Sequence, residues 1–94
     1  MEDYEIPRLY ETENVPFEDK FVYQRWLHPS SDWYWLIAEY EPREEMAFGM
    51  AHGFYDEWGY ISMDELRDVG AYKDPSWEPV KYRDAVGKIE MERR

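Results

Sequence analysis

The chain has 94 residues, a formal net charge of −11 and an aromatic content of 19%. This length allows one domain with one hydrophobic core, and the lack of cysteine excludes disulfide bonds and thiolate metal sites. No apolar run is long enough for a membrane span or a signal peptide, so we expect a soluble, cytoplasmic protein.

The negative charge lies in two blocks. Residues 1–19 contain seven acidic residues and one basic residue, and residues 41–68 contain eight acidic and two basic residues. A surface of this sign repels phosphate backbones, which disfavours direct nucleic-acid binding. It attracts basic protein surfaces and speeds encounter with them, so we expect a basic protein partner.

Residues 1–19 are predicted to form an acidic extended arm. Pro7 and Pro16 disfavour a long regular element, whereas apolar residues such as Ile6 and Phe17 can anchor the segment to a core. We therefore expect an arm that is partly docked. It has two interpretations, a solvated, charge-rich terminus or a partner-binding segment.

A β-hairpin is predicted next. The run Lys20–Leu27 is rich in aromatic and β-branched residues, and His28–Asp32 supplies turn formers. The second strand, Trp33–Glu41, is apolar on both faces, which predicts a central strand covered on two sides or one whose second face meets a partner. Alternation places Trp33, Trp35 and Ile37 on one face and Tyr34, Leu36, Ala38 and Tyr40 on the other.

A third strand and a reversal follow. The strand Met46–His52 alternates large side chains with Ala47, Gly49 and Ala51, and small residues on one face allow another element to approach closely. Glycine opens the predicted reversal Gly53–Glu57, where its missing Cβ atom permits positive φ.

A fourth strand then leads into a predicted helix. The sequence Ser62–Glu65 matches S-x-x-E, in which the serine and glutamate side chains satisfy free N–H groups at a helix start. We expect the helix to pack Met63, Leu66 and Val69 against the small-residue face of the third strand. Gly70 is expected to end it.

The last quarter of the chain has weaker signals. Trp77, Val80 and Tyr82 predict a short edge strand, because the neighbouring prolines are confined to sheet edges and strand ends. Residues 84–94 are predicted to form a short helix or a frayed tail. The apolar positions available to that helix are Val86, Ile89 and Met91.

The predicted fold is a single α+β domain over residues 1–94. Its core covers residues 20–83 and consists of an antiparallel sheet of four to five strands with one short helix packed on it. The pattern does not fix the strand order.

Four segments of the chain carry a set of recognisable motifs. They are LYETENVP (residues 9–16), SDWYWLIAEYEP (31–42), FGMAHGF (48–54) and EWGYISMDEL (57–66). Their Trp-Tyr-Trp, Phe-Gly and Glu-Trp-Gly-Tyr motifs resemble, in order and spacing, a small family of uncharacterised bacterial, plasmid and phage proteins, a domain of unknown function. Residues 76–84 look like a degraded copy of that family's Val-Glu-Arg-Asp strand. The resemblance implies a mobile-element context in bacteria, and it carries over no catalytic residue.

The candidates for chemistry are one histidine and several carboxylates. His52 lies near Asp56 and Glu57 in the sequence, a combination able to bind a metal or serve a small hydrolase, although a turn histidine is the simpler interpretation. Adjacent carboxylates could serve acid–base work, but in turns and at a helix start solvent screens them. We therefore predict no enzyme activity and no catalytic, cofactor-binding or metal-binding residue. The carboxylate pairs are Glu44–Glu45, Asp56–Glu57 and Asp64–Glu65.

The acidic and aromatic residues of the second block are the predicted partner-binding site. Carboxylates in a fixed array can stand in for nucleic-acid phosphates, and Trp and Tyr anchor many interfaces. Together with the mobile-element resemblance, this predicts a non-enzymatic inhibitor of a host nucleic-acid-targeting defence complex, an anti-CRISPR or anti-restriction protein acting as a nucleic-acid mimic. The predicted residues are Glu41, Glu44, Glu45, Asp56, Glu57, Trp58, Tyr60, Asp64, Glu65 and Asp68.

Two other interpretations stay open. The acidic blocks can serve only to keep a small aromatic-rich protein soluble. Alternatively, the protein is an adaptor or subunit in plasmid maintenance that contacts its partner through an exposed strand or an aromatic face. Affinity that barely changes with salt would favour the adaptor, because apolar and main-chain contacts are weakly screened.

Overall fold

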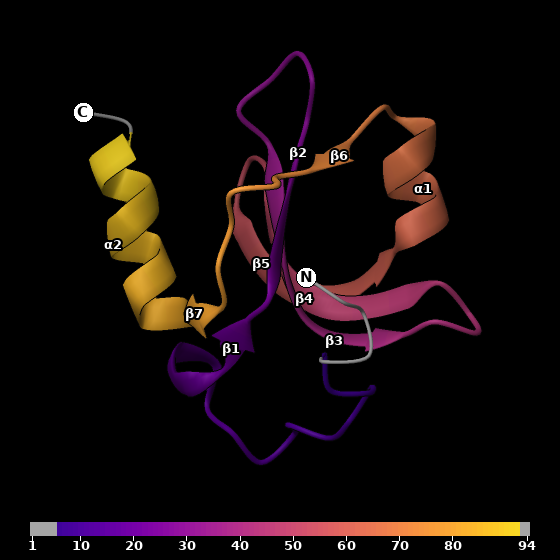
Figure 1. The fold of residues 1–94 in the computed structure, drawn as a ribbon, viewed down its shortest axis with the longest axis vertical. Coiled ribbons are helices and arrows are strands. Elements are labelled where there is room, and N and C mark those ends of the chain that lie inside the picture. Colours follow the sequence, from indigo (N-terminus) through magenta and orange to yellow (C-terminus); the bar gives the residue numbers. More distant parts are fainter. Residues whose placement is uncertain (1–5, 93–94) are drawn as a thin grey trace.

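The computed structural model describes residues 6–92 (Figure 1), so residues 1–5 of the predicted arm and 93–94 of the predicted tail lie outside the described residues. The elements are the 3-10 helix η2 (Phe17–Asp19), the strands β1 (Phe21–Val22), β2 (Gln24–Leu27), β3 (Tyr34–Glu41), β4 (Met46–His52), β5 (Asp56–Ser62), β6 (Tyr72–Lys73) and β7 (Val80–Lys81), and the helices α1 (Met63–Asp68) and α2 (Tyr82–Glu92). A five-stranded antiparallel sheet has the order β5-β4-β3-β2-β6, and β1 pairs with β7 in a second, two-stranded sheet. The predicted α+β class is confirmed.

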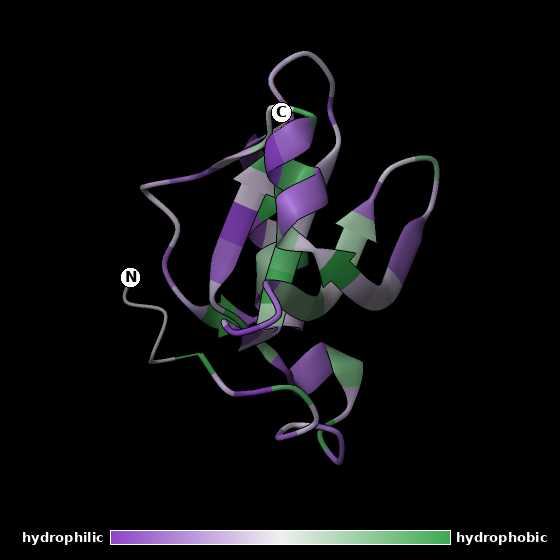
Figure 2. Cartoon of the chain, turned by 90° about the vertical axis from the view of Figure 1, so that its right-hand side faces the viewer, coloured by the Kyte–Doolittle hydropathy of each residue, from purple (hydrophilic) through white to green (hydrophobic). Residues whose placement is uncertain are grey.

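Strand β3 is the centre of the fold and is covered on both faces, as its two apolar faces predict. On one face Ile37 packs in a cluster with Leu66 of α1. On the other face Leu36 packs with Met50 and with Ile89 of α2. The two helices therefore lie on opposite sides of the sheet (Figure 1), and hydrophobic colour gathers on the strands between them (Figure 2).

A β-bulge in β3 reverses the face of the sheet on which the side chains at the end of the strand lie. The pairing with β4 shifts between Ile37 and Glu39, so that Glu39 lies opposite Phe48. Tyr40 consequently joins the cluster of Ile37, whereas strict alternation predicted it on the face of Leu36. That prediction is wrong because one extra residue reverses the alternation, and the same shift turns Glu39 toward the N-terminal segment.

Helix α1 starts at a serine cap and stops at a glycine, as predicted, but among the described residues the Glu65 carboxylate accepts no hydrogen bond, so only the serine half of the predicted S-x-x-E motif forms. The Ser62 side chain accepts a hydrogen bond of 3.2 Å from an N–H of the first turn. At the other end Gly70 has a φ of 85°, and its N–H donates to the Arg67 carbonyl at 3.0 Å. The Ala71 N–H donates to the Leu66 carbonyl at 2.9 Å, which completes a Schellman motif.

The helix buries two of the three side chains predicted to pack on the sheet. Met63 and Leu66 lie in the cluster that contains Ala47 of β4, so the small-residue face of β4 does receive the helix. Val69 is 53% exposed, and its predicted packing is wrong. The helix ends at Asp68, so Val69 is already the C-cap residue and turns away from the sheet.

At Gly49 and Gly53 neighbouring atoms leave little or no space for a side chain. A Cβ atom on Gly49 would lie 1.9 Å from the Leu36 carbonyl oxygen, because β3 and β4 approach closely there. A Cβ atom on Gly53 would lie 3.2 Å from the Trp33 ring, which packs over the turn. The positive φ that glycine permits is not adopted at Gly53, since among the described glycines Gly70 alone has one.

The N-terminal segment is docked, as predicted, but it is not extended. Turns over residues 9–14 and the helix η2 replace the expected extended arm. Ile6 is buried in the cluster beneath α1, and the Pro7 carbonyl accepts a hydrogen bond of 2.9 Å from the Tyr40 N–H. The Glu39 carboxylate, which the bulge directs toward this segment, accepts hydrogen bonds from its N–H groups and holds the turns against the sheet.

The chain after α1 forms two short strands where one was predicted. β6 pairs with β2 at the edge of the main sheet, and β7 pairs with β1. Trp77 lies in the turn between them, so its predicted place in a strand is wrong. Its ring is buried, and its N–H donates to the Val22 carbonyl at 3.2 Å. The Arg25 guanidinium and the Lys88 ammonium lie 4.9 and 4.6 Å from the ring centre and fix the turn beneath α2.

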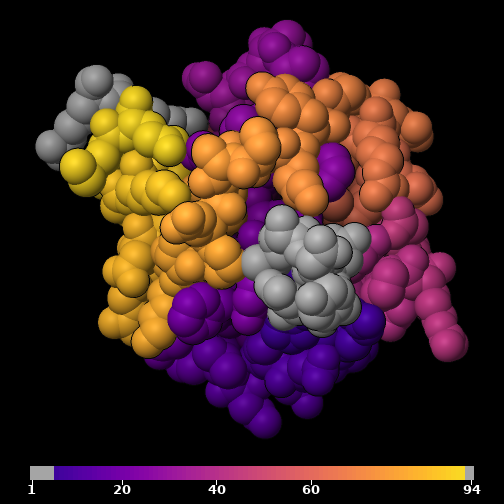
Figure 3. All heavy atoms as spheres, viewed as in Figure 1, coloured from indigo at the N-terminus to yellow at the C-terminus, as the bar shows by residue number. Residues whose placement is uncertain are grey.

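Helix α2 confirms the predicted C-terminal helix over the described residues. Ala85 and Ile89 are buried and Val86 is half-buried. Met91 is 73% exposed, so its predicted contribution to packing is wrong, because the helical turn directs it away from the sheet. In the space-filling view α2 and α1 occupy opposite sides of the molecule, with the segment containing β6 between them (Figure 3).

Candidate functional site

The predicted partner-binding residues fall at three separate places. One group lies on α1 and on the turn between β3 and β4, and we call this surface the acidic end. Asp56 and Glu57 lie at the far end of β5, about 20 Å away for a strand of this length. Trp58 and Tyr60 lie on β5 on the face opposite α1. The acidic end consists of Glu41, Glu44, Glu45, Asp64, Glu65 and Asp68.

Half of the acidic end is held by contacts within the protein. Glu45 accepts a hydrogen bond from the Tyr40 hydroxyl and forms an ion pair of 2.5 Å with Arg67. The hydrogen bond from Tyr40, followed by the Arg67 contact, lowers the pKa of Glu45 below its ordinary value. Arg67 also pairs with Asp64 at 3.3 Å, and Glu41 accepts a hydrogen bond from a neighbouring backbone N–H at 3.0 Å.

The other half of the acidic end is exposed. Glu44, Glu65 and Asp68 are exposed, and within residues 6–92 none of them forms an ion pair. The elements that carry them are rigid, because α1 is capped at both ends and the Met63 N–H donates to the Glu45 carbonyl at 2.9 Å. These three carboxylates are therefore available to a partner and are carried on an ordered backbone.

The two predicted aromatic anchors have different environments. Trp58 stacks on Phe17 with ring centres 4.7 Å apart and contacts Tyr82 edge-on at 5.1 Å, so it joins the N-terminal segment to α2. Tyr60 is 58% exposed, and its hydroxyl donates to the Tyr10 hydroxyl at 2.9 Å. That hydrogen bond raises the pKa of Tyr60. Tyr60 is accessible to a partner, whereas Trp58 has a packing role.

The histidine considered for chemistry has one carboxylate partner. His52 Nδ1 lies 2.5 Å from a carboxylate oxygen of Asp56, and its ring stacks on Tyr34 with centres 4.5 Å apart. Residues 6–92 contain no group of three or more His, Cys, Asp or Glu side chains arranged to hold a metal ion. Glu57 faces the other side of the sheet from His52, since strand neighbours alternate.

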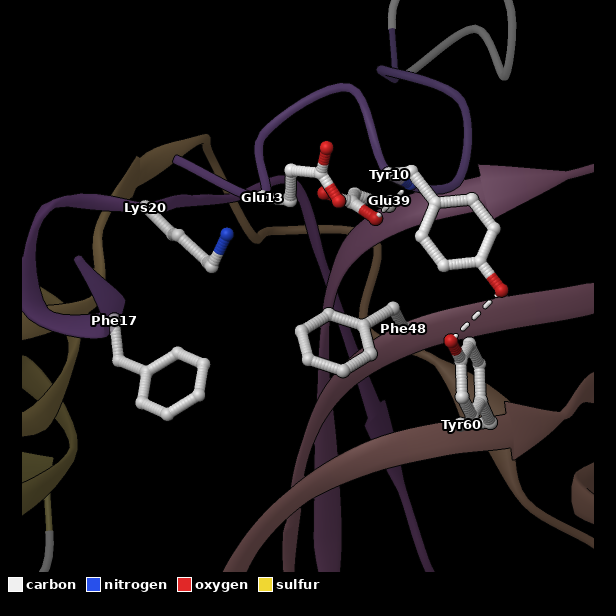
Figure 4. Close-up of a pocket in the computed structure, with 7 residues that line it drawn as sticks. All are labelled: Tyr10, Glu13, Phe17, Lys20, Glu39, Phe48 and Tyr60. Atoms are coloured by element: carbon white, nitrogen blue, oxygen red, sulfur yellow. Dashed lines mark hydrogen bonds between the residues drawn. The ribbon is translucent and has the colours of Figure 1, made fainter. Parts of the chain in front are cut away.

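A first hollow, the arm pocket, lies between the N-terminal segment and the sheet (Figure 4). Its volume is about 180 Å³. Lys20 and Glu39 are each 3% exposed at its inner wall. The Lys20 ammonium donates to the Thr12 carbonyl and hydroxyl, and the Glu39 carboxylate accepts from the N–H groups of Tyr10 (2.8 Å) and Thr12 (2.9 Å). The lining residues are Tyr10, Glu13, Phe17, Lys20, Glu39, Phe48 and Tyr60.

The arm pocket is best understood as a structural junction. Both buried charges are satisfied by Thr12 and its neighbours, so neither is free to act as a base or to bind an ion. Sequence reasoning missed this pair. The available signal was Glu39 itself, a carboxylate within an otherwise apolar strand.

A second hollow, the hairpin pocket, lies beside the turn between β4 and β5. Its volume is about 220 Å³. It is rich in aromatic side chains and has one carboxylate, Glu57, of the predicted set. The aromatic residues of the turn were missed as site residues, although two consecutive aromatic residues in a turn are a recognisable signal. The lining residues are Trp33, Trp35, Ala51, His52, Gly53, Phe54, Tyr55 and Glu57.

Comparison with known proteins found no similar protein. No family model, curated protein or solved structure matches the chain. None of the described helices is both long and apolar enough to cross a membrane. The class of this protein is therefore defined only by its fold and its surface. It is a small acidic α+β domain with exposed carboxylates at one end of the sheet and an aromatic hollow at the other.

Proposed function

We propose that this protein is a non-enzymatic binding protein whose acidic end engages a basic protein surface. The observation that carries the proposal is the exposure of Glu44, Glu65 and Asp68, without ion pairs inside the described chain, on rigid neighbouring elements. Because the backbone that carries these carboxylates is held by α1 and its caps, binding orders only their side chains, and their charge contributes to affinity and to the rate of encounter.

The partner that best complements such a surface is a protein that itself binds nucleic acid. Its groove has Lys and Arg side chains placed for phosphates, and carboxylates on a rigid element can occupy the same positions. The resemblance of the sequence to phage and plasmid proteins supports a narrower form of the proposal, an inhibitor of a host restriction or CRISPR complex. Such an inhibitor needs no bond-making chemistry of its own.

The test is a matched pair of charge reversals. Glu44, Glu65 and Asp68 are changed together to Lys, and the control changes Glu18, Glu78 and Glu90 to Lys. All six are exposed, and both variants alter the net charge equally. Binding partners are captured from bacterial lysate at low and high salt, and the affinity of the captured partner is then measured by calorimetry.

The expected result is a loss of at least tenfold in affinity for the first variant and less than threefold for the control. Wild-type affinity should also fall steeply with salt, because the contacts are between exposed charges. Equal losses in the two variants would mean that net charge alone attracts the partner, and the acidic end would not be the binding surface. Thermal unfolding of both variants checks that the fold is intact.

A second candidate function is supported by β5. This seven-residue strand is an edge of the main sheet and pairs only with β4 among the described strands. An edge strand of this length offers backbone groups to which a partner can add a strand, as an adaptor or subunit would require. Affinity that stays constant from low to high salt, and that the charge reversals leave unchanged, would favour this function over the first.

A further inference from the structure

The hairpin pocket has an aromatic wall and an acidic wall on one face of the sheet. Trp35 of β3, Ala51 of β4 and Glu57 of β5 lie in register in one row across three strands. Neighbouring strands are about 4.8 Å apart, so Trp35 and Glu57 stand on either side of a small residue. Because alanine fills little of this space, the row leaves a hollow between an indole ring and a carboxylate.

The tip of the hairpin adds further rings. Trp33 is 41% exposed and meets Phe54 edge-on, with ring centres 5.4 Å apart and planes at 78°. Gly53 allows this approach, since a Cβ atom there would lie 3.2 Å from the Trp33 ring. Phe54 and Tyr55 are 88% and 77% exposed. No packing need of the fold explains aromatic side chains left so open, and exposed apolar groups of this kind mark interaction sites.

Two tryptophans elsewhere in the molecule, Trp26 and Trp77, show one way of filling such a space. Trp26 pairs with Trp35 in the same row, and the Arg67 guanidinium lies 5.9 Å from its ring centre while it pairs with Glu45 at 2.5 Å. On the other face the Arg25 guanidinium lies 4.9 Å from the Trp77 ring and pairs with a neighbouring aspartate at 2.6 Å. Trp26 and Trp77 thus each share an arginine with a carboxylate, whereas Trp58 packs on other aromatic rings.

The hairpin pocket has tryptophan rings and a carboxylate, as the sites of Trp26 and Trp77 do, but it has no cation between them. Among residues 6–92, no Lys or Arg lies over Trp33, Trp35, Phe54 or Tyr55, and Glu57 has no ion pair. We propose that this pocket receives one arginine side chain of a partner protein, its guanidinium against the indole rings and its N–H groups on the Glu57 carboxylate. The inference rests on the proposed function in one respect, namely that the partner is basic.

The shape and charge of the pocket select arginine. A guanidinium is planar and weakly hydrated, so it stacks on aromatic faces and binds a carboxylate through two parallel hydrogen bonds. Lysine offers a compact, strongly hydrated charge that makes neither contact as well. A volume of about 220 Å³ is enough for a single side chain. The net charge of −11 raises the local concentration of cationic groups around it.

The experiment uses short capped peptides as probes: Gly-Arg-Gly, Gly-Lys-Gly, and Gly-citrulline-Gly, in which the guanidinium is replaced by a neutral group of the same shape. Binding to the full chain is followed by the indole N–H signals of the tryptophans in nitrogen-correlated NMR spectra. We expect the arginine peptide to shift the signals of Trp33 and Trp35 and to leave that of Trp77 unchanged. The citrulline peptide should bind at least fivefold more weakly, and the lysine peptide in between.

Two variants locate the contact. Glu57→Gln keeps the size of the side chain and removes its charge, and Glu18→Gln makes the same change at an exposed position on η2, far from the pocket in the chain. We expect affinity for the arginine peptide to fall about three- to tenfold in Glu57→Gln and to stay unchanged in Glu18→Gln. Equal binding of arginine and citrulline peptides, equal effects of the two variants, or shifts confined to other tryptophans would overturn the proposal. Concentration-dependent dimerisation that broadens Trp33 and Trp35 without any peptide would also overturn it, because a second copy would then occupy the pocket.

The failure of this inference can be told apart from failure of the proposed function. The triple charge reversal at the acidic end should leave the arginine-peptide shifts intact, since those residues lie at the other end of the sheet. If that variant loses the partner while the peptide fails to bind wild-type protein, the pocket assignment alone is wrong. If the peptide binds through Glu57 and the triple variant keeps full affinity for the partner, the acidic end is not the partner surface and the pocket stands.

Discussion

The arm side and the hairpin side of the sheet use the same residue types in opposite ways. On the arm side, the Glu39 carboxylate and the Lys20 ammonium are buried and satisfied by Thr12 and its neighbours. On the hairpin side, the Glu57 carboxylate and the rings around it are open to solvent. Carboxylates in this acidic chain are therefore of two kinds, those that hold the fold together and those left for a partner. Stability and binding measurements should separate them.

The sharpest contrast is between two glycines that face each other across β4 and β5. Gly49 and Gly59 are register partners, but a Cβ atom on Gly49 would meet the Leu36 backbone at 1.9 Å, whereas one on Gly59 would meet nothing within 4 Å. We expect Gly49→Ala to lower the free energy of unfolding by about 3 kcal/mol or more. Gly59→Ala should change it by less than about 0.5 kcal/mol. Urea denaturation of both variants gives the comparison, and similar losses would show that the two positions are equally packed.

The next largest effect is expected at Glu39. Glu39→Ala removes the acceptor for the partly buried N–H groups of Tyr10 and Thr12, which should cost about 2 kcal/mol. Glu39→Gln keeps one acceptor oxygen, so about half of that loss is expected. Glu44→Gln is the control from the exposed set and should change stability by less than about 0.5 kcal/mol. A Glu39→Ala variant as stable as the control would contradict the division into two kinds of carboxylate.

A third carboxylate, Asp74, should give the protein an acid-sensitive component of stability. Burial alone would raise its pKa, but hydrogen bonds from Ser76 and from Arg25 outweigh burial and hold the pKa below its ordinary value of 3.8. A lowered pKa stabilises the fold above the ordinary value, and this stability is lost as the pH falls through the lowered pKa. Asp74→Asn should cost about 2 kcal/mol at pH 7. The variant should also lose less stability than wild type between pH 5 and 2, as followed by circular dichroism, and parallel curves would count against this role.

The smallest expected effect concerns the start of α1, which positions the exposed carboxylates of the acidic end. Ser62→Ala removes the N-cap hydrogen bond and should cost about 1 kcal/mol, and Ser62→Asp should restore most of it. Because α1 also carries Glu65 and Asp68, the alanine variant should weaken partner binding, and the aspartate variant should not. Calorimetry of both variants measures this. Binding that is unaffected in the alanine variant would show that α1 need not be rigid.

The elements with local signals could be predicted from the sequence. The hairpin, the reversal after His52, the cap at Ser62 and the stop at Gly70 each depend on a few neighbouring residues, and the structure has all of them. The α+β class followed from these elements. What failed is partly local and partly distant in sequence: the Asp74 side chain and carbonyl close a turn on Ser76 and Trp77, and Arg25 and Lys88 lie over the Trp77 ring.

The bulge in β3 is the clearest feature that the sequence pattern could not predict. Alternation assigns Tyr40 and Glu39 to faces that are each reversed in the structure, since pairing shifts after Ile37. No residue in this stretch signals the extra position. The location of the candidate site was also not predictable from the pattern. The acidic block is continuous in the sequence, but in the sheet the length of β5 separates Glu57 from the acidic end. The predicted residues were therefore real surface groups without a common location.

The hydrogen bonds from Tyr10 and Thr12 to Glu39 provide two built-in reporters of motion. Amide hydrogen exchange at these positions measures how often the segment before η2 lifts from the sheet, independently of global unfolding. Slow exchange at both amides, at the rate of the β3 core, would make the segment part of one cooperative unit. Exchange that is faster than in the β3 core and equal at the two amides would show that the segment opens separately as a flap over Tyr60. The exchange rates would then give the free energy of that opening.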